Sequence, residues 1–123
     1  MEFPAHFPEQ CPPNTSSEAK GDLFRFVANK PPQATDFVSH HLLGKKYDKE
    51  KHCEACGLSV LVNEADVKQF LKATPAFRKK YVARGRVSPD WGKIAQTGKF
   101  SHHTWWVPVG KSPELIFKVI AIK

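Results

Sequence analysis

The chain has 123 residues, of which 41% are hydrophobic and 25% are charged. This length suits a single domain with its own core, and the composition excludes a chain that is disordered throughout. The formal net charge of +7 favours an anionic partner such as a nucleotide or a nucleic acid. No apolar run approaches the roughly 18 residues needed to span a bilayer, so no membrane partner is expected.

The cysteines and the N-terminal residues bear on the compartment. The N-terminus has no basic segment followed by an apolar stretch, so we expect no secretory signal there. Cys11, Cys53 and Cys56 are few and odd in number, which favours a reducing compartment over a disulfide framework. We therefore expect a cytoplasmic protein.

The proline pattern divides the chain into two parts. Residues 1–22 contain four prolines, and proline fixes φ and removes an amide donor, so we expect an extended N-terminal arm. Residues 23–123 are expected to form a single α+β domain. Its first strand covers 23–27, and alternation places Phe24 and Phe26 on one face and Arg25 on the other.

Further elements follow in chain order. Thr35 or Asp36 is expected to cap a short helical turn that ends near His41, and a lysine-rich loop covers 44–51. A strand at 58–62 leads into a helix capped by Asn63, and Pro75 fits the first turn of a second short helix. Strands are expected at 81–87 and 104–107. The apolar run 115–122 predicts a central strand. The predicted fold is α+β, a mostly antiparallel twisted sheet of about four to six strands with one or two short helices.

Positive charge is concentrated late in the chain. Between Arg78 and Lys99 seven cations accompany one acid, a net charge of +6. Arg84 and Arg86 in this segment are candidates for contacts with phosphate groups. The alternatives are a solvated basic face, or a surface that docks on an acidic protein partner.

A Cys-x-x-Cys spacing joins Cys53 and Cys56, which would supply half of a tetrahedral zinc site. The other half would have to come from His40-His41 or His102-His103, and neither pair has a standard zinc-ligand spacing. We therefore expect no metal.

The segment 102–106 reads His-His-Thr-Trp-Trp. Imidazoles can transfer a proton near neutral pH, and indoles stack on bases or cations. His102, His103, Trp105 and Trp106 are therefore candidate ligand-binding residues. The alternative is a core strand whose histidines find partners within the protein.

Arg25 interrupts an apolar strand and is the strongest single candidate for contact with a phosphate or carboxylate. It would otherwise pair with Asp22 or Asp36. Ser39-His40 and Ser101-His102 do not define a nucleophile triad, because adjacency in sequence does not create triad geometry. The chain contains neither a Walker pattern nor G-x-G-x-x-G.

Three segments, DFVSH at 36–40, CEACGLSV at 53–60 and HHTWW at 102–106, resemble motifs of small, uncharacterised bacterial proteins. That resemblance implies a bacterial cytoplasmic setting and no particular activity. A second resemblance is to ADP-ribosyltransferase-like folds, which place an Arg or His on an early strand and a Ser or Tyr on a later strand that leads into a helix. Arg25 and Ser59 occupy such positions here, whereas the late glutamate of that pattern has no clear counterpart, Glu114 being a poor one.

The leading hypothesis is a domain that binds a phosphate-bearing ligand, either a nucleotide or a nucleic acid. The alternatives are an NAD-using enzyme of the ADP-ribosyltransferase-like kind and a module that docks on an acidic protein. In the enzyme alternative NAD is the cofactor, and Arg25, Ser59 and His103 are the candidate catalytic residues. Whether the protein is an enzyme stays open at this level.

Overall fold

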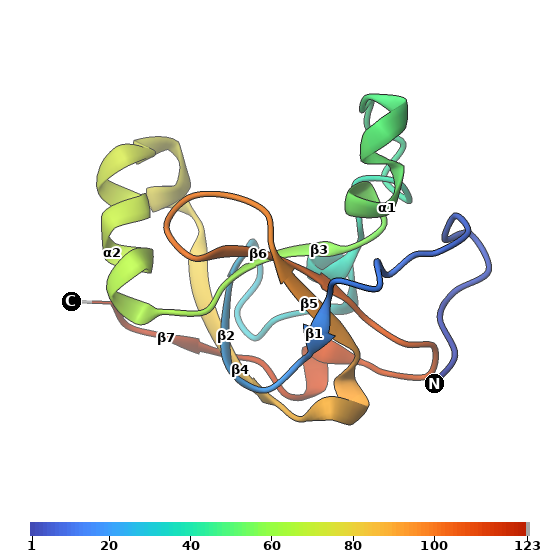
Figure 1. Ribbon diagram of the computed structural model, residues 1–123. Helices are drawn as coiled ribbons and strands as arrows, with labels where there is room; N and C mark the ends of the chain where they lie inside the picture. Colours follow the sequence, from blue (N-terminus) through green and yellow to red (C-terminus); the bar gives the residue numbers. More distant parts are fainter. Residues whose placement is uncertain (123) are drawn as a thin grey trace.

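A seven-stranded antiparallel sheet organises residues 1–122, the part of the chain that the computed structural model describes (Figure 1). The strands are β1 (Ser17–Glu18), β2 (Gly21–Val27), β3 (Leu58–Leu61), β4 (Tyr81–Val87), β5 (Lys93–Gln96), β6 (His102–Trp106) and β7 (Lys118–Ile120). The α-helices are α1 (His52–Ala55) and α2 (Glu64–Ala73). The 3-10 helices are η1 (Ala34–Phe37), η2 (Lys49–Lys51), η3 (Pro75–Lys79), η4 (Pro89–Trp91) and η5 (Pro113–Leu115).

The strand order is β1-β5-β6-β3-β2-β4-β7. The expected α+β class and antiparallel sheet are confirmed, and so are the strands at 23–27, 58–62 and 81–87 in their essentials. The cap of α2 is confirmed as well, since the Asn63 side chain accepts a hydrogen bond of 2.8 Å from the Ala65 amide. Pro75 begins η3, as expected for a residue that lacks an amide donor.

Two expectations about the sheet are wrong. It has seven strands rather than four to six. The short strands β1 and β5 were not predicted because they lack strong apolar alternation; β1 pairs with β5, and β5 pairs with β6. The run 115–122 is not a central strand, since only its residues Lys118–Ile120 pair, at the sheet edge beyond β4. Its apolar residues instead pack against the two cores: Ile116 and Val119 lie against the larger core, and Ile120 and Ile122 lie against the smaller one. Phe117 is buried in the larger core and packs over Gly85, where an added Cβ would lie 2.5 Å from the ring.

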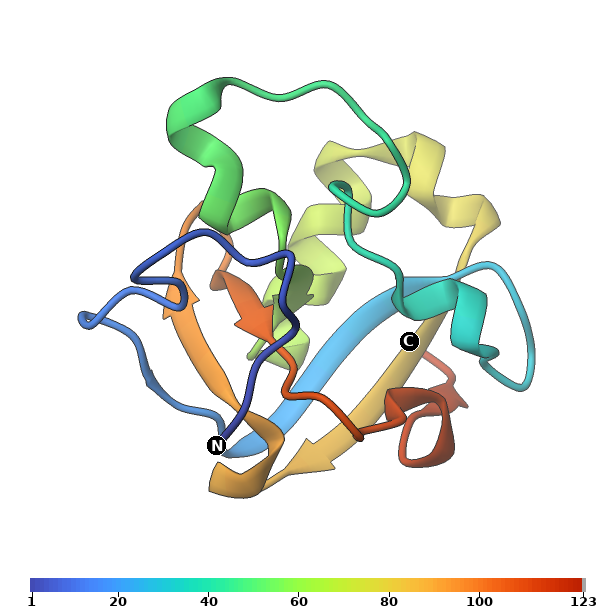
Figure 2. The same ribbon diagram turned by 90° about the vertical axis from the view of Figure 1, so that its right-hand side faces the viewer.

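Apolar side chains fill both faces of the sheet, as the alternation along β2 requires. Leu23 and Val27 belong to the larger core with Trp105 and Phe117, whereas Phe24 belongs to a smaller core on the opposite face. Helix α2 covers the smaller core with Val67, which is fully buried. Figures 1 and 2 show α2 and the segment after it at one end of the sheet, and α1 and the loop before it rising separately.

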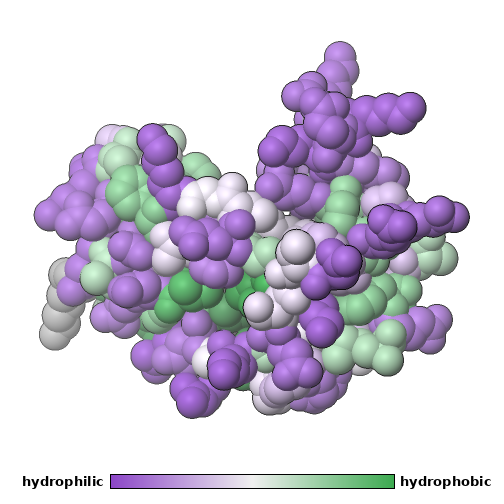
Figure 3. Space-filling view, viewed as in Figure 1, coloured by the Kyte–Doolittle hydropathy of each residue, from purple (hydrophilic) through white to green (hydrophobic). Residues whose placement is uncertain are grey.

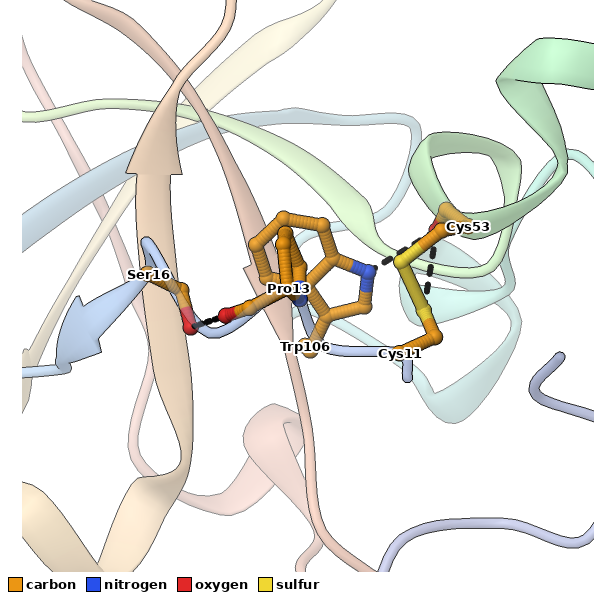
Figure 4. Close-up of a disulfide and its surroundings, with 5 residues drawn as sticks. All are labelled: Cys11, Pro13, Ser16, Cys53 and Trp106. Carbon is orange, nitrogen blue, oxygen red and sulfur yellow. Dashed lines mark hydrogen bonds between the residues drawn. A yellow bond between two sulfur atoms is a disulfide. The ribbon is translucent and has the colours of Figure 1, made fainter. Parts of the chain in front are cut away.

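The N-terminal arm is fastened to the domain at several points, among them a hydrogen bond of 3.0 Å from the Val109 amide to the Glu2 carbonyl. Strand β1 within it pairs with β5, and Cys11 forms a disulfide with Cys53 of α1 (Figure 4). The expectation that the cysteines form no disulfide is wrong, because the spacing along the chain gave no sign that Cys11 and Cys53 meet across 42 residues. The cysteine argument for a reducing compartment loses its basis. Within residues 1–122, no helix is long and apolar enough to cross a membrane.

Candidate functional site

The sheet opens between its middle strand, β3, and the neighbouring strand β2. Strand β2 pairs with β4 over all seven of its residues but pairs with β3 only where Phe24 faces Leu61. Beyond that position β2 and β3 diverge, and a cavity of about 760 Å³ occupies the gap and the space above it. In Figure 3 one lobe over α2 and another over α1 and its preceding loop rise on either side of a hollow. We call this cavity the cleft.

Strands, helices and loops from several parts of the chain line the cleft, among them η1 and α1. Strands β2 and β3 contribute the floor, with Arg25 and Ser59 among its side chains. The α2–η3 segment contributes Phe70, Phe77 and Lys80. The loop before α1 contributes polar and charged groups, namely His40, Lys45, Tyr47, Asp48 and Lys51. Strand β6 adds His102 and Thr104.

Arg25 spans the opening between β2 and β3. Its Nε donates to the Asp36 backbone carbonyl at 2.9 Å, and one terminal nitrogen donates to the Ser59 carbonyl at 2.8 Å. The guanidinium also lies over the Phe37 ring, 5.6 Å from its centroid. Burial lowers the pKa of Arg25 to about 10, and the charge of Asp36 opposes this shift. These two carbonyls hold the side chain in place. The N–H groups of the other terminal nitrogen make no hydrogen bond within residues 1–122, so they remain able to bind a ligand.

Neither of the expected carboxylate partners binds Arg25. Asp22 pairs with Arg86 at 3.3 Å instead. Asp36 directs its carboxylate to the backbone amides of Ala28 and Gln33, each at 2.8 Å, and so closes the turn that η1 begins. Asp36 therefore acts from the third position of η1 and not as its N-cap, which is Gln33. In the part of the chain that the structure describes, Arg25 makes no ion pair.

Positive charge prevails near Arg25. Burial lowers the pKa of His40, and the nearby Lys45 and Arg25 lower it further. Lys45 and Lys80 form no ion pair within residues 1–122, whereas Lys51 faces Glu54 at 3.7 Å. Among the lining acids, Asp48 alone neither pairs with a lysine nor binds backbone amides within residues 1–122. The inner part of the cleft consequently suits an anionic group.

Three phenylalanines form an apolar wall on the α2 side. The ring centroids of Phe26 and Phe70 are 5.2 Å apart, and Phe77 meets both rings edge-on at 5.2 and 5.1 Å. All three are half-buried, so part of each ring remains open to the cleft. Such a wall accommodates a flat ring in the cavity that Arg25 also lines, from the other face of β2.

The β6 side of the cleft carries a short chain of polar groups. The Thr97 hydroxyl lies 3.1 Å from His102 Nδ1 and 2.9 Å from the Thr104 hydroxyl. Burial lowers the pKa of His102, with His103 adding to the shift and Glu54 opposing it. Thr104 is paired in register with Ser59, whose side chain is exposed to the cleft.

The remaining residues of the His-Trp segment lie outside the cleft. His103 Nδ1 contacts the Ser101 carbonyl at 2.7 Å. Trp105 is fully buried and donates to the Trp91 carbonyl at 2.8 Å. Trp106 is 2% exposed and donates to the Cys53 carbonyl at 2.8 Å (Figure 4). The structure gives both indoles a core position, so it does not support the expectation that they stack on a ligand. Their polar edges had partners in the backbone that the sequence could not display.

Arg84 and Arg86 also lie outside the cleft, exposed on β4, and Arg86 binds Asp22. Among the eight candidate residues, the cleft unites Arg25, Ser59 and His102. Sequence reasoning missed Lys45 and Lys80 as site residues, because each belongs to a lysine-rich stretch in which position alone marks no member. The wall formed by Phe26, Phe70 and Phe77 was missed too, because each of these residues fits the apolar pattern of an ordinary core position.

Comparison with models of protein families, with curated proteins and with solved structures finds no match for this chain.

Proposed function

We propose that the cleft binds a nucleotide through its phosphate groups. The observation that carries this proposal is Arg25, a half-buried cation held by two carbonyls on the cleft floor and without an ion pair in residues 1–122. A charge in such surroundings is costly unless an opposite charge joins it. A phosphate that accepts the remaining guanidinium donors would provide that charge, in the forked geometry that arginine favours.

The rest of the cleft fits the other parts of a nucleotide. A volume of about 760 Å³ falls within the roughly 300–1,000 Å³ range of small-molecule sites. Lys45 and Lys80 supply further positive charge for additional phosphates, and the wall of Phe26, Phe70 and Phe77 offers apolar surface to a base. Ser59 and Thr104 add hydroxyls for hydrogen bonds to a ribose.

The test uses two matched lysine pairs. Lys80 lines the cleft and its neighbour Lys79 does not, and the same holds for Lys45 and Lys46, while all four side chains are exposed. We expect titration calorimetry with AMP, ADP, ATP and NAD⁺ to detect binding. Lys80→Ala and Lys45→Ala should weaken it about threefold to tenfold, the range for loss of one solvated phosphate contact. Lys79→Ala and Lys46→Ala should leave the affinity unchanged.

Replacement of the Arg25 guanidinium provides a second test. Arg25→Lys keeps the charge but cannot bridge two carbonyls and a phosphate, so we expect a larger loss of affinity than for either lysine. Thermal unfolding without nucleotide shows whether this variant retains its fold. The proposal fails if none of the four nucleotides binds, or if all four lysine variants weaken binding equally.

An NAD-using transferase is the second candidate function, and one contact favours it. Arg25 of β2 donates directly to the Ser59 carbonyl of β3, so the two residues of the ADP-ribosyltransferase-like pattern meet on the floor of one cleft. Acids from the late strands do not line the cleft within the described residues, which leaves the glutamate of that pattern without a counterpart. Release of nicotinamide during incubation with NAD⁺, abolished by Arg25→Lys, would favour the transferase. Binding of NAD⁺ without turnover would favour a nucleotide-binding module.

A further inference from the structure

Three side chains that can ligate a metal meet beside α1, outside the group assigned to the nucleotide. The ligand atoms of His41, His52 and Cys56 all lie within 4.8 Å of one another. A tetrahedral zinc ion with ordinary bond lengths holds nitrogen and sulfur ligands about 3.3–3.6 Å apart. Side-chain shifts of about an ångström would therefore close this cluster around an ion.

Local structure explains why these residues converge. His52 opens α1 and Cys56 caps it, and a separation of four residues places both side chains on one face of a helical turn. The Cys56 amide donates to the His52 carbonyl at 3.2 Å, which fixes that turn. His41 comes from the preceding loop, and its amide is bonded to the Ala55 carbonyl at 3.0 Å. Backbone contacts thus position all three residues.

The polar atoms of the cluster lack the partners that a purely structural role would require. His52 Nε2 is buried and has no hydrogen-bond partner within residues 1–122. Cys56 is a buried free thiol. His41 Nδ1 lies 2.7 Å from the Tyr47 hydroxyl, a contact that orients the ring and leaves Nε2 as its second nitrogen. A buried imidazole nitrogen without a partner is uncommon in native proteins and calls for a ligand.

We propose that His41, His52 and Cys56 bind one divalent transition-metal ion of the zinc class. Two imidazoles and a thiolate are the donor set that Zn²⁺ prefers over magnesium or calcium. Tyr47 serves as the outer partner of His41. Three protein ligands leave a fourth position for water, next to a second cavity of about 260 Å³ that Cys56 and His6 line.

This proposal departs from the sequence-based expectation of no metal. That expectation paired Cys53 with Cys56 and found no second pair of ligands. The structure holds Cys53 in a disulfide with Cys11 and brings His41 and His52 to Cys56 instead. The relevant spacing is therefore His-x-x-x-Cys at 52–56, which the overlapping Cys-x-x-Cys obscured.

Cobalt substitution tests the proposal on the full chain with its disulfide intact, after dialysis against a chelator. We expect Co²⁺ to bind at one ion per chain and to produce a sulfur-to-cobalt charge-transfer band, which one equivalent of Zn²⁺ removes. Cys56→Ser should abolish the band, and His52→Gln should weaken Co²⁺ affinity at least tenfold. His40→Gln, which alters the exposed neighbour of His41, should change neither.

Two results would overturn the proposal. The first is a wild-type chain that binds no stoichiometric Co²⁺ or shows no charge-transfer band, and this result does not depend on any variant folding. The second is a Cys56→Ser protein that keeps the band, because the sulfur ligand would then lie elsewhere. Nucleotide titrations play no part in this readout, so failure of the metal site leaves the proposed function untouched.

Discussion

Asp36 shows how one side chain supports a site without entering it. Its carboxylate accepts hydrogen bonds from the Ala28 and Gln33 amides and from Asn29, and its backbone carbonyl receives Arg25. Burial opposes its ionisation, yet the two amides, Asn29 and the charge of Arg25 outweigh burial and lower the pKa of Asp36 below its ordinary value of 3.8. The turn that presents Arg25 to the cleft thus depends on an ionised aspartate.

Replacement of this carboxylate should cost stability in a pH-dependent way. We expect Asp36→Asn to lower the free energy of unfolding by about 1–3 kcal/mol at neutral pH, because an amide donor would face backbone donors. A lowered folded-state pKa stabilises fully above the unfolded value near 3.8, and this stabilisation is lost as pH falls through the folded-state value. Urea unfolding at several pH values should therefore show the difference from wild type shrinking below about pH 3.8.

Asp48→Asn is the control for this measurement, since Asp48 is exposed and binds no backbone amide among the hydrogen bonds of residues 1–122. It should change stability by less than about 0.5 kcal/mol. A difference for Asp36→Asn that stays constant from pH 7 down to pH 2.5 would contradict the role given to its carboxylate.

Single residues were predictable where their type conflicted with their local pattern. Arg25 could be singled out because a guanidinium within an apolar strand needs hydrogen-bond partners or access to solvent. In the structure it has two carbonyl partners and also lines the cleft. Trp105 and Trp106 stood out for the same reason, but their indole donors are satisfied by carbonyls of Trp91 and Cys53. The difference lies in distant backbone groups, which no local pattern specifies.

At the scale of elements, the disulfide is the main feature that sequence reasoning missed. The Pro-rich arm was expected to be extended, and nothing in the sequence indicated that Cys11 fastens it to α1 beside the buried Trp106 (Figure 4). Strands with clear alternation, such as β2 and β4, were predictable because burial of one face determines their register. The short strands β1 and β5 were not, since their pairing depends on where the arm is held.

Removal of this cross-link should loosen the arm. The disulfide joins residues 42 apart, and for a loop of that length chain entropy gives a stabilisation of about 4 kcal/mol, with smaller values common in practice. We expect the Cys11→Ser/Cys53→Ser double variant to lose about 2–4 kcal/mol of unfolding free energy in urea. Reduced wild-type protein should behave like the double variant, and reductant should leave the double variant unchanged. Equal stability of the oxidised and reduced wild type would show that the bond contributes nothing.

Across the whole molecule, the charge of +7 is not a single patch. The basic segment from Arg78 to Lys99 sends Lys80 into the cleft but leaves Arg84 exposed on β4, outside it. Arg86 is engaged with Asp22. Composition could reveal the excess of positive charge. Only the folded structure shows that one of these cations lines the cleft, one is exposed outside it and one is paired with an acid.

This separation yields a prediction that distinguishes a small nucleotide from a nucleic acid. Polyanion binding to exposed cations is driven by counterion release, so the affinity for a single-stranded oligonucleotide should fall linearly with salt on logarithmic axes, by about 0.7 per phosphate contact. Arg84 is an exposed cation without an ion pair within residues 1–122, and Arg84→Ala should therefore reduce that slope by about 0.7. The same substitution should leave the affinity for ADP unchanged, because Arg84 does not line the cleft. Lys80→Ala, in contrast, should weaken ADP binding.

Fluorescence anisotropy with a labelled oligonucleotide, measured between 50 and 200 mM salt alongside ADP calorimetry, separates the two surfaces. If Arg84→Ala weakens ADP binding as much as Lys80→Ala does, the cleft is not where the nucleotide binds. If oligonucleotide binding is instead independent of salt, the exposed arginines do not form a polyanion-binding surface at all.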